Sequence, residues 1–214
     1  MRRLGMLLTA PCAVSILLAG ALLPVTPALA QGFPATGQTK AYQADKNDGI
    51  DGPVDVPDDG TLQRGKTLRY KVRKDGTVED KNTGLIWEVK CTGAGCPALH
   101  DVGNTYPWSG NGSTDTIWDW LDKINAEGGK GYAGHDDWRI PNVRELQSIS
   151  DFGMVSPAAI DPIFGPTIAS DYWSSTTDAS DPSCAWVVPF ADGLVNASEE
   201  NLSLFVRAVR GGPK

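Results

Sequence analysis

Apolar residues recur at helical spacing in two stretches of the chain, residues 117–124 and 143–149. Each stretch follows a residue suited to cap a helix, with an acidic partner three positions later. The sequence therefore predicts two amphipathic helices, and it places Trp118 and Trp120 on the buried edge of the first. The capping pairs are Thr116 with Asp119 and Asn142 with Glu145.

Short runs of alternating or continuous apolar residues predict the β-strands. Asp75-Gly76 and Thr83-Gly84 separate the first three strands, which therefore form a hairpin or meander, and Asp192-Gly193 marks a later hairpin. Together with long irregular connections, these elements indicate an α+β domain. The predicted strands cover residues 68–73, 77–80, 85–89, 172–176, 185–190, 194–197 and 204–210.

Residues 1–30 have the features of a secretory signal peptide. An Arg pair precedes an apolar run over residues 4–25, and Ala28-Leu29-Ala30 is a small-x-small cleavage site. A membrane anchor is the alternative, but two prolines interrupt the run and no basic stop-transfer cluster follows. The sequence predicts cleavage after Ala30 and export to the periplasm, the cell exterior or the cell surface, with no transmembrane segment afterwards.

The composition is that of a globular chain with an acidic balance. Hydrophobic residues make up 41% of the 214 residues, which is enough for a core and excludes a wholly disordered protein. The chain has 19 Lys and Arg against 26 Asp and Glu, a net charge of −7. This excess of acid argues against a nucleic-acid binder, because phosphate contacts need a basic surface.

The segment after the signal peptide carries much of the acidic charge. Residues 31–65 contain no Trp, whereas all seven Trp lie between Trp87 and Trp186. Within this acidic arm, residues 45–60 hold six Asp and one Lys. No register matches the EF-hand pattern, so a solvated flexible arm and a looser calcium loop are the two interpretations. Apart from that calcium alternative, no cofactor is predicted.

The predicted strand at residues 68–73 has the opposite charge. Arg69, Lys71 and Arg73 alternate with apolar residues, which predicts one basic face and one apolar face. Three interpretations are open. The stretch is an edge strand kept soluble by charge, a ridge that binds sulfated or carboxylated glycans, or a surface onto which the acidic arm folds back.

Three cysteines remain after signal cleavage, and an oxidising compartment favours disulfides over metal thiolates. Cys91 and Cys96 enclose a short Gly-rich loop and are predicted to pair, which leaves Cys184 without a partner. The alternative is a three-ligand zinc site made of Cys91, Cys96 and His100, although this spacing matches no strong zinc pattern.

Six motifs occur in order along the chain: GLIWE (84–88), GYAGHDDWRIPNVRELQSISD (131–151), IDPIF (160–164), DYWSSTT (171–177), AWVVPFADG (185–193) and FVRAVRG (205–211). Together they resemble the Lcl C-terminal domain, a bacterial family named for a collagen-like adhesin and grouped with C-type-lectin-like folds. TGQT (36–39) also resembles the segment that often precedes this domain. The predicted organisation is a signal peptide (1–30), a flexible acidic arm (31–65) and an Lcl C-terminal lectin-like domain (66–214).

The resemblance implies a C-type-lectin-like α+β fold, with two helices packed on a twisted antiparallel sheet, long loops, and termini on neighbouring strands. It also implies export and, for the namesake, adhesion and binding of sulfated polysaccharide. The sequence lacks the EPN, QPD and WND motifs of calcium-dependent lectins. Where many members read VRCVR in the last strand, Ala208 replaces the Cys, which fits Cys184 as the remaining half of a second disulfide.

Site residues fall into a structural group and a ligand-binding group. Charged residues beside buried Trp more often lock loops to the core, whereas aromatics in Gly/Ser/Asn-rich loops can stack on sugar rings. Structural roles are predicted for Trp87, Trp138, Arg139, Asn142, Glu145, Trp173 and Arg207. Ligand-binding roles are predicted for Tyr106 and Trp108 in the variable segment 99–114, for the segment 178–183, and for Arg69, Lys71 and Arg73.

The leading hypothesis is a non-catalytic exported binding or adhesion module for an anionic glycan or a surface protein. His100 and His135, the two His in the sequence, lie in no motif that presents a nucleophile, so no catalytic residue or metal ligand is predicted. A second hypothesis is a structural component of a cell-envelope complex, in which acidic arms and basic strands of neighbouring copies pair as a homo-oligomer. A third is an enzyme like the formylglycine-generating enzymes, although Cys91 and Cys96 lie in a Gly-rich loop.

Overall fold

The computed structural model describes residues 32–41, 57–110, 112, 114–154 and 156–212. The predicted signal peptide and most of the Asp-rich segment lie outside these ranges, and with them the calcium-loop prediction. The described part combines short helices with two β-sheets whose strand pairs are nearly all antiparallel, which confirms the α+β class. None of its helices is long and apolar enough to cross a membrane.

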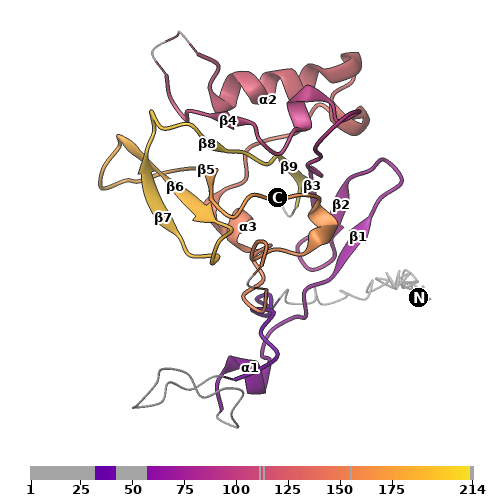
Figure 1. The fold of residues 1–214 in the computed structure, drawn as a ribbon, viewed down its shortest axis with the longest axis vertical. Helices are drawn as coiled ribbons and strands as arrows, with labels where there is room; N and C mark the ends of the chain where they lie inside the picture. The colour runs from indigo at the N-terminus through magenta and orange to yellow at the C-terminus, as the bar shows by residue number, and fades with distance from the viewer. Residues whose placement is uncertain (1–31, 42–56, 111, 113, 155, 213–214) are drawn as a thin grey trace, which may run out of the picture. The chain divides into compact units, whose positions relative to one another are not determined.

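The four-stranded sheet begins with the predicted meander. Its strands are β1 (Tyr70–Val72), β2 (Val78–Asp80), β3 (Leu85–Trp87) and β9 (Val209–Gly211), in the order β1-β2-β3-β9 (Figure 1). The turns on either side of β2 contain Gly76 and Gly84, with φ of 83° and 73°. Residues with a Cβ rarely adopt this conformation, so the two glycines fix where the chain reverses.

The positions of the first and last strands differ from the expectation drawn from the family resemblance. The last strand, β9, pairs with β3, and β1 lies at the opposite edge of the sheet. The physical reason is that two tight hairpins join β1, β2 and β3, so the free edge of β3 is where a later strand can add. The prediction that the termini lie on neighbouring strands is therefore wrong.

The five-stranded sheet has the order β4-β8-β5-β6-β7. The β5–β6 and β6–β7 pairs are antiparallel, and β8 pairs with β5 in parallel. The return strand after Asp192-Gly193 starts two residues later than predicted, because the amide of Gly193 donates to the carbonyl of Pro189 within the turn. The strands are β4 (Thr105–Tyr106), β5 (Asp171–Thr177), β6 (Cys184–Pro189), β7 (Asn196–Glu199) and β8 (Leu204–Phe205).

The stretch 204–210, predicted as one strand, is divided between the two sheets. β8 belongs to the five-stranded sheet and β9 to the four-stranded sheet. Between them, Val206, Arg207 and Ala208 are buried as the chain crosses from one sheet to the other. The prediction of a single strand is wrong because alternating apolar residues indicate extended backbone and carry no information on which sheet it joins.

Both predicted helices are present, and α1 (Asp59–Leu62) adds a single turn in the N-terminal arm. α2 (Ile117–Ala126) begins after Thr116, and α3 (Val143–Gln147) begins after Asn142. Each carries the complete capping box that the sequence predicted. Short 3-10 helices lie at Ala98–His100, Glu127–Gly129, Tyr132–Gly134 and Pro162–Phe164.

The two Trp of α2 have different environments. Trp120 is fully buried and stacks on Tyr106 of β4, where α2 lies next to that strand (Figure 1). Trp118 is 36% exposed and meets Trp108 edge to face, with ring centres 4.9 Å apart. The prediction that Trp118 is a core residue is wrong, because it lies off the stripe formed by Ile117, Trp120 and Ile124.

The core consists of two hydrophobic clusters. One lies between the four-stranded sheet, α3 and β5, and the other lies between α2 and the five-stranded sheet. The largest side chains of the first cluster are Trp87, Leu146, Phe164, Tyr172 and Phe190. The largest of the second cluster are Trp120, Ile124, Trp138, Ile140 and Trp173. Aromatic residues spread along the sequence thus supply both clusters with bulky side chains.

Residues 32–41 of the N-terminal arm run along the domain. The amide of Phe152 donates to the carbonyl of Thr36 at 2.7 Å. The next residue, Gly37, has φ of 87°, and a Cβ there would lie 2.0 Å from a carboxylate oxygen of Asp151. Glycine has no Cβ and adopts positive φ readily, so Gly37 of the TGQT motif lets the arm approach the turn after α3 closely.

Candidate functional site

Four charged side chains are buried together beneath the 3-10 helix Ala98–His100. Glu88 and Arg207 have no exposed surface, and Lys90 and His100 are each 2% exposed. We call these four residues the buried ionic cluster. Burying charge is costly unless each group has partners, so the contacts of every member matter for the fold.

Glu88 is the centre of the buried ionic cluster. It directly follows β3, where its Oε1 lies 2.9 Å from Lys90 Nζ and 2.8 Å from His100 Nδ1. Its other oxygen, Oε2, accepts from the amide of Ala208 at 2.9 Å. The Lys90 ammonium also lies 4.7 Å above the ring of Trp120. The carboxylate therefore balances two cations and joins β3 to the crossing between β8 and β9.

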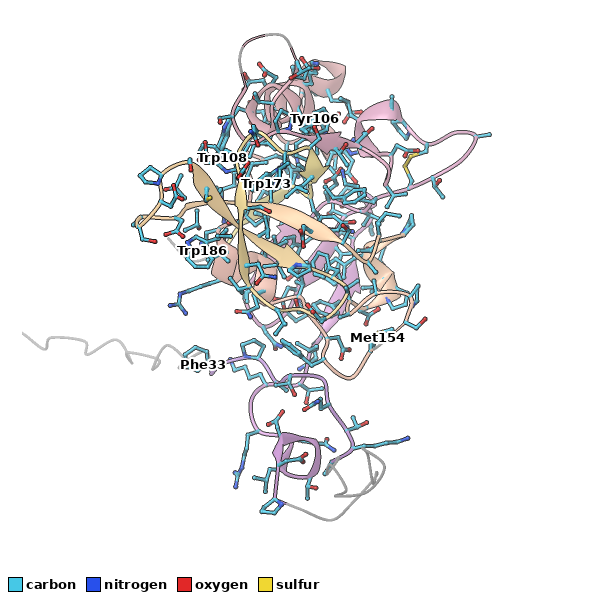
Figure 2. The ribbon with its side chains drawn as sticks, turned by 60° about the vertical axis from the view of Figure 1, so that its left-hand side comes forward. Phe33, Tyr106, Trp108, Met154, Trp173 and Trp186 are labelled. Carbon is cyan, nitrogen blue, oxygen red and sulfur yellow. A yellow bond between two sulfur atoms is a disulfide. The ribbon has the colours of Figure 1, made fainter. Side chains whose placement is uncertain are left out.

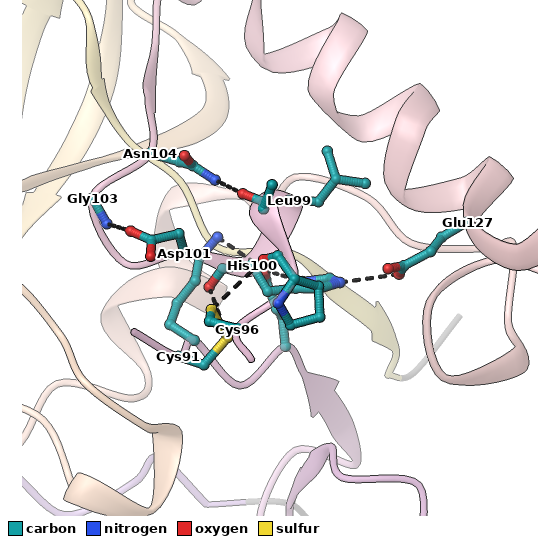
Figure 3. Close-up of a disulfide and its surroundings, with 12 residues drawn as sticks. Cys91, Cys96, Leu99, His100, Asp101, Gly103, Asn104 and Glu127 are labelled. Atoms are coloured by element: carbon teal, nitrogen blue, oxygen red, sulfur yellow. Dashed lines mark hydrogen bonds and ion pairs between the residues drawn. A yellow bond between two sulfur atoms is a disulfide. The ribbon is translucent and has the colours of Figure 1, made fainter. Parts of the chain in front are cut away.

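His100 connects Glu88 to a second carboxylate. Its Nε2 lies 3.0 Å from Glu127 Oε2, in the 3-10 helix that follows α2 (Figure 3). Ionised carboxylates only accept hydrogen bonds, so both ring nitrogens must donate and the imidazole carries a positive charge. Tyr132 covers the ring, with centroids 4.0 Å apart. A histidine with both nitrogens engaged in this way has no free lone pair to act as a general base.

The predicted disulfide holds the backbone of His100. Cys91 and Cys96 are bonded, with Cα atoms 5.5 Å apart, which confirms the pairing. The amide of Cys91 donates to the carbonyl of His100 at 3.1 Å. The alternative of a zinc site with Cys91, Cys96 and His100 is wrong, because the two sulfurs are bonded to each other. Across the described ranges, no three His, Cys, Asp or Glu side chains converge in a way that could hold a metal ion.

Arg207 joins three segments through its guanidinium. Nη1 donates to the carbonyls of Glu88 at 2.9 Å and Phe164 at 2.8 Å, and Nη2 donates to the hydroxyl of Thr167 at 2.9 Å. A planar guanidinium can satisfy several acceptors at once, which a lysine cannot do in this geometry. Arg207 thus fixes the chain crossing between the sheets to β3 and to the loop before β5.

The environment of the buried ionic cluster changes the pKa of its members. Burial alone would raise the pKa of Glu88, but the charges of Lys90 and His100 outweigh it and lower the pKa to about 2. Burial lowers the pKa of Lys90, with Glu88 opposing the shift. For His100, burial acts to lower the pKa, and the bonds and charges of Glu88 and Glu127 overcome it and raise the pKa.

These shifts predict a pH dependence of stability. Because folding raises the pKa of His100, its contribution is complete below about pH 6.5, the ordinary value, and is lost as the pH rises through the raised pKa. The urea midpoint of the protein should therefore fall as the pH rises above neutrality. The same measurement on His100→Gln should give a flatter profile. His135→Gln, which removes the other His, is the control and should keep the decline; equal profiles for all three proteins would contradict the assignment.

Other residues with predicted structural roles lie around the two core clusters. The Trp138 indole donates to the carbonyl of Tyr132 at 2.9 Å, and the Trp173 indole donates to the carbonyl of Tyr106 at 2.8 Å. Trp87 is fully buried against Phe164. The bonds of Trp138 and Trp173 tie these two indole rings to loops, and burial keeps Trp87 away from any ligand.

The DWRIPN motif forms a compact charged junction. Arg139 makes two hydrogen bonds to Glu145, at 2.6 and 2.7 Å, and a third to the carbonyl of Gly211. The Asn142 side chain caps α3, and the backbone amide of Asn142 donates to the Glu145 carboxylate. A bidentate Arg–carboxylate pair is among the stronger ionic contacts in proteins. The motif therefore joins the start of α3 to β9.

Tyr106 and Trp108 lie together with Trp173 at the α2 end of the domain (Figure 2). Both are half-buried rather than exposed loop residues, and both pack against the second core cluster. The indole of Trp108 donates to the carbonyl of Ser174 at 2.9 Å. The accessible aromatic surface here therefore consists of the Trp108 ring and its neighbour Trp118.

Arg69, Lys71 and Arg73 lie in a different region, on β1 and its flanks. The register places Lys71 opposite Glu79 of β2, and the carbonyl of Arg69 accepts from the amide of Lys81. Alternating residues share a face, so these cations project from the side of the sheet opposite Val78 and Trp87, which face the core. We call Arg69, Lys71, Arg73 and Lys81 the basic sheet face.

The two groups of predicted ligand-binding residues therefore occupy separate parts of the molecule. The buried ionic cluster contains one predicted site residue, Arg207, and sequence reasoning missed the roles of Glu88, Lys90 and His100. Cys184 is half-buried opposite Glu199 of β7, whereas the carbonyl of Ala208 accepts from the amide of Glu88 and the amide of Ala208 donates to the Glu88 carboxylate. The contacts of these two positions thus involve different elements, and the disulfide-remnant interpretation of Cys184 gains no support from them.

The sequence model of the Lcl C-terminal domain matches residues 76–210, more than half of the chain. The chain belongs to the Lcl C-terminal domain family. No curated protein matches the sequence. The matched part of the Lcl C-terminal domain contains the whole buried ionic cluster, both capping boxes and the disulfide. Arg69, Lys71 and Arg73 precede it, so most of the basic sheet face lies outside the part that the family model describes.

Proposed function

We propose that this Lcl C-terminal domain is a non-catalytic exported binding module that holds an anionic polysaccharide on its basic sheet face. The observation that carries the proposal is the grouping of cations on β1 and its flanks, with Arg69 and Lys71 exposed, in a chain whose net charge is −7. A local basic surface on an acidic protein attracts a polyanion to one place and leaves the rest of the molecule repulsive.

In the described part of the chain, two of the four cations of the basic sheet face are paired with carboxylates, and two are not. Glu79 lies 2.7 Å from Lys81 and 3.9 Å from Arg73, and Asp75 lies 3.3 Å from Arg73. These carboxylates neutralise the inner part of the face. Arg69 and Lys71 form no ion pair within the described ranges and remain exposed, so they are the cations available to sulfate or carboxylate groups.

The position of β1 suits an extended ligand. β1 pairs with β2 alone, and its side chains are reached from the open edge of the sheet. Arg69, Lys71 and Arg73 are spaced at every second residue, about 7 Å apart along the strand. A linear polysaccharide can therefore lie along the strand and meet successive cations. Binding of this kind relies on charge and weakens steeply with salt, because the polyanion releases its counterions.

Two further observations support a binding role in an exported protein. Both ring nitrogens of His100 face carboxylates, which leaves this imidazole without a free lone pair to act as a base. The Cys91–Cys96 disulfide fits an oxidising compartment.

Retention on immobilised heparin tests the proposal. We expect the purified domain to bind at low salt and Arg69→Ser plus Lys71→Ser to weaken binding roughly tenfold, since each exposed ionic contact contributes up to about 1 kcal/mol. Lys40→Ser plus Lys130→Ser removes the same charge from other exposed positions and should retain most of the binding. Salt-dependent binding that survives the first pair of substitutions would sink the proposal.

A further inference from the structure

A small cavity of about 240 Å³ lies between the N-terminal arm and α3. Phe33 and Phe152 contribute aromatic walls, and Arg144, Gln147 and Ser150 contribute polar groups. Pockets for drug-sized ligands usually measure roughly 300–1,000 Å³, so this cavity fits a smaller occupant. It lies at the opposite end of the domain from Trp108, as the position of Phe33 indicates (Figure 2).

Backbone hydrogen bonds fix the walls of the cavity. The carbonyl of Phe33 accepts from the amide of Lys66 at 2.9 Å, and the amide of Ala35 donates to the carbonyl of Lys66 at 2.7 Å. On the other side, the carbonyl of Thr36 accepts from the amide of Phe152. The arm is thus attached on both sides of the opening, and the cavity exists before any ligand arrives.

Two polar groups at the cavity lack a protein partner within the described ranges. Ser150 is 3% exposed, and its buried hydroxyl makes no hydrogen bond. Native proteins rarely leave a buried hydroxyl unbonded, and a rotation of the Ser150 side chain toward the cavity that it lines would offer this hydroxyl to a bound acceptor. Arg144 is exposed and forms no ion pair with any described carboxylate. The side chain of Phe33, which also lines the cavity, is 87% exposed, a large value for an aromatic residue.

We propose that this cavity binds a compact apolar carboxylate. The apolar part would contact Phe33 and Phe152, and the carboxylate would accept from the guanidinium of Arg144 and the hydroxyl of Ser150. The ligand would give the unbonded hydroxyl its acceptor, the guanidinium its counter-charge and the exposed Phe33 ring a contact. This site is separate from the basic sheet face and does not depend on the polysaccharide proposal.

Titration of the isotope-labelled domain with hexanoate, followed by NMR, tests the proposal. Acetate carries the same charge without the chain, and 1-hexanol carries the chain without the charge. We expect saturable shifts around Ser150 and Phe152 with hexanoate, and at least tenfold weaker binding of each comparison compound. Equal binding of acetate and hexanoate, or shifts that do not saturate, would overturn the proposal.

Variants separate ligand binding from a structural role. Arg144→Gln should weaken hexanoate binding about tenfold, to the level of 1-hexanol, whereas Arg144→Lys should retain part of it. Arg64→Gln removes an exposed Arg outside the cavity lining and should leave binding unchanged. Ser150→Ala should lower hexanoate affinity without reducing the urea midpoint of the free protein, because the hydroxyl has no partner to lose. Unchanged hexanoate affinity in Arg144→Gln would also overturn the proposal.

Discussion

Replacing Glu88 with Gln is expected to lower the free energy of unfolding by about 3–5 kcal/mol, the loss typical when one partner of a buried ion pair is removed. Glu88 is fully buried and contacts both Lys90 and His100 within 3 Å. A glutamine has nearly the same shape but no charge, so Lys90 would become a buried cation without a counter-ion, and His100 would keep only its contact with Glu127. Urea unfolding at pH 6, followed by Trp fluorescence, measures the effect.

Glu79→Gln provides the matched control for this experiment. Glu79 lies on β2, and its ion pair with Lys81 is partly exposed to solvent. Such surface pairs contribute about 0–1 kcal/mol, so this variant should unfold close to the parent protein. A loss in Glu88→Gln no larger than in Glu79→Gln would mean that the buried ionic cluster does not hold the fold together.

Replacing Arg207 with Met is expected to cost about 3 kcal/mol or more. Met fills a similar volume, but the carbonyl of Glu88 would lose the Arg207 donor, and the carbonyl of Phe164 would keep only its longer bond from the amide of Lys90. The hydroxyl of Thr167 would keep only its bond to the carbonyl of Gly165. Each buried polar group left without a partner costs about 1–3 kcal/mol. The same urea unfolding experiment checks this prediction.

Arg210→Met is the control for Arg207→Met. Arg210 lies three residues further along the chain and bonds Asp137, whose side chain is 56% exposed. Water can replace that contact, so the loss of unfolding free energy should be about 1 kcal/mol or less. Similar losses in both variants would show that the three acceptors bonded by Arg207 find other donors.

Local features of this fold were predictable from the sequence because their causes lie within a few residues. A capping box joins residues three positions apart, as Thr116 and Asp119 do, and the disulfide encloses a short loop between Cys91 and Cys96. Turns next to β2 are fixed by glycines with positive φ. In each case the residue type alone determines the backbone conformation.

The buried ionic cluster could not be predicted in this way, because its contacts join distant segments. Glu88 reaches the amide of Ala208, 120 residues later, and Arg207 reaches Phe164, 43 residues earlier. Alternation along β3 would place Glu88 on the same face as the half-buried Ile86. Ile86 itself packs against the second core cluster, and the amide of Glu88 still pairs with the carbonyl of Ala208, so the carboxylate enters the interior on that face. A charged residue directly after a wholly apolar strand was the one available signal.

The aromatic loop illustrates a different difficulty. A Trp in a Gly/Ser/Asn-rich segment suggests an exposed platform, and the sequence cannot reveal that Ser174 accepts from the indole of Trp108. On α2, the exact angle of each residue around the helix decided that Trp118 is exposed while Trp120 is buried. Solvent exposure of an aromatic residue thus depended on partners that lie far away in the chain.

The division of residues 204–211 between the two sheets has a consequence for how the protein is made. This stretch supplies one strand to each sheet. Within it, Arg207 donates to the carbonyl of Glu88, the residue directly after β3, and to Thr167 in the loop before β5. Neither sheet can be completed until the ribosome has released these residues. For the proposed export route, a chain that lacks these residues would have two incomplete sheets, and we expect it to enter a narrow translocation channel more easily than the finished domain.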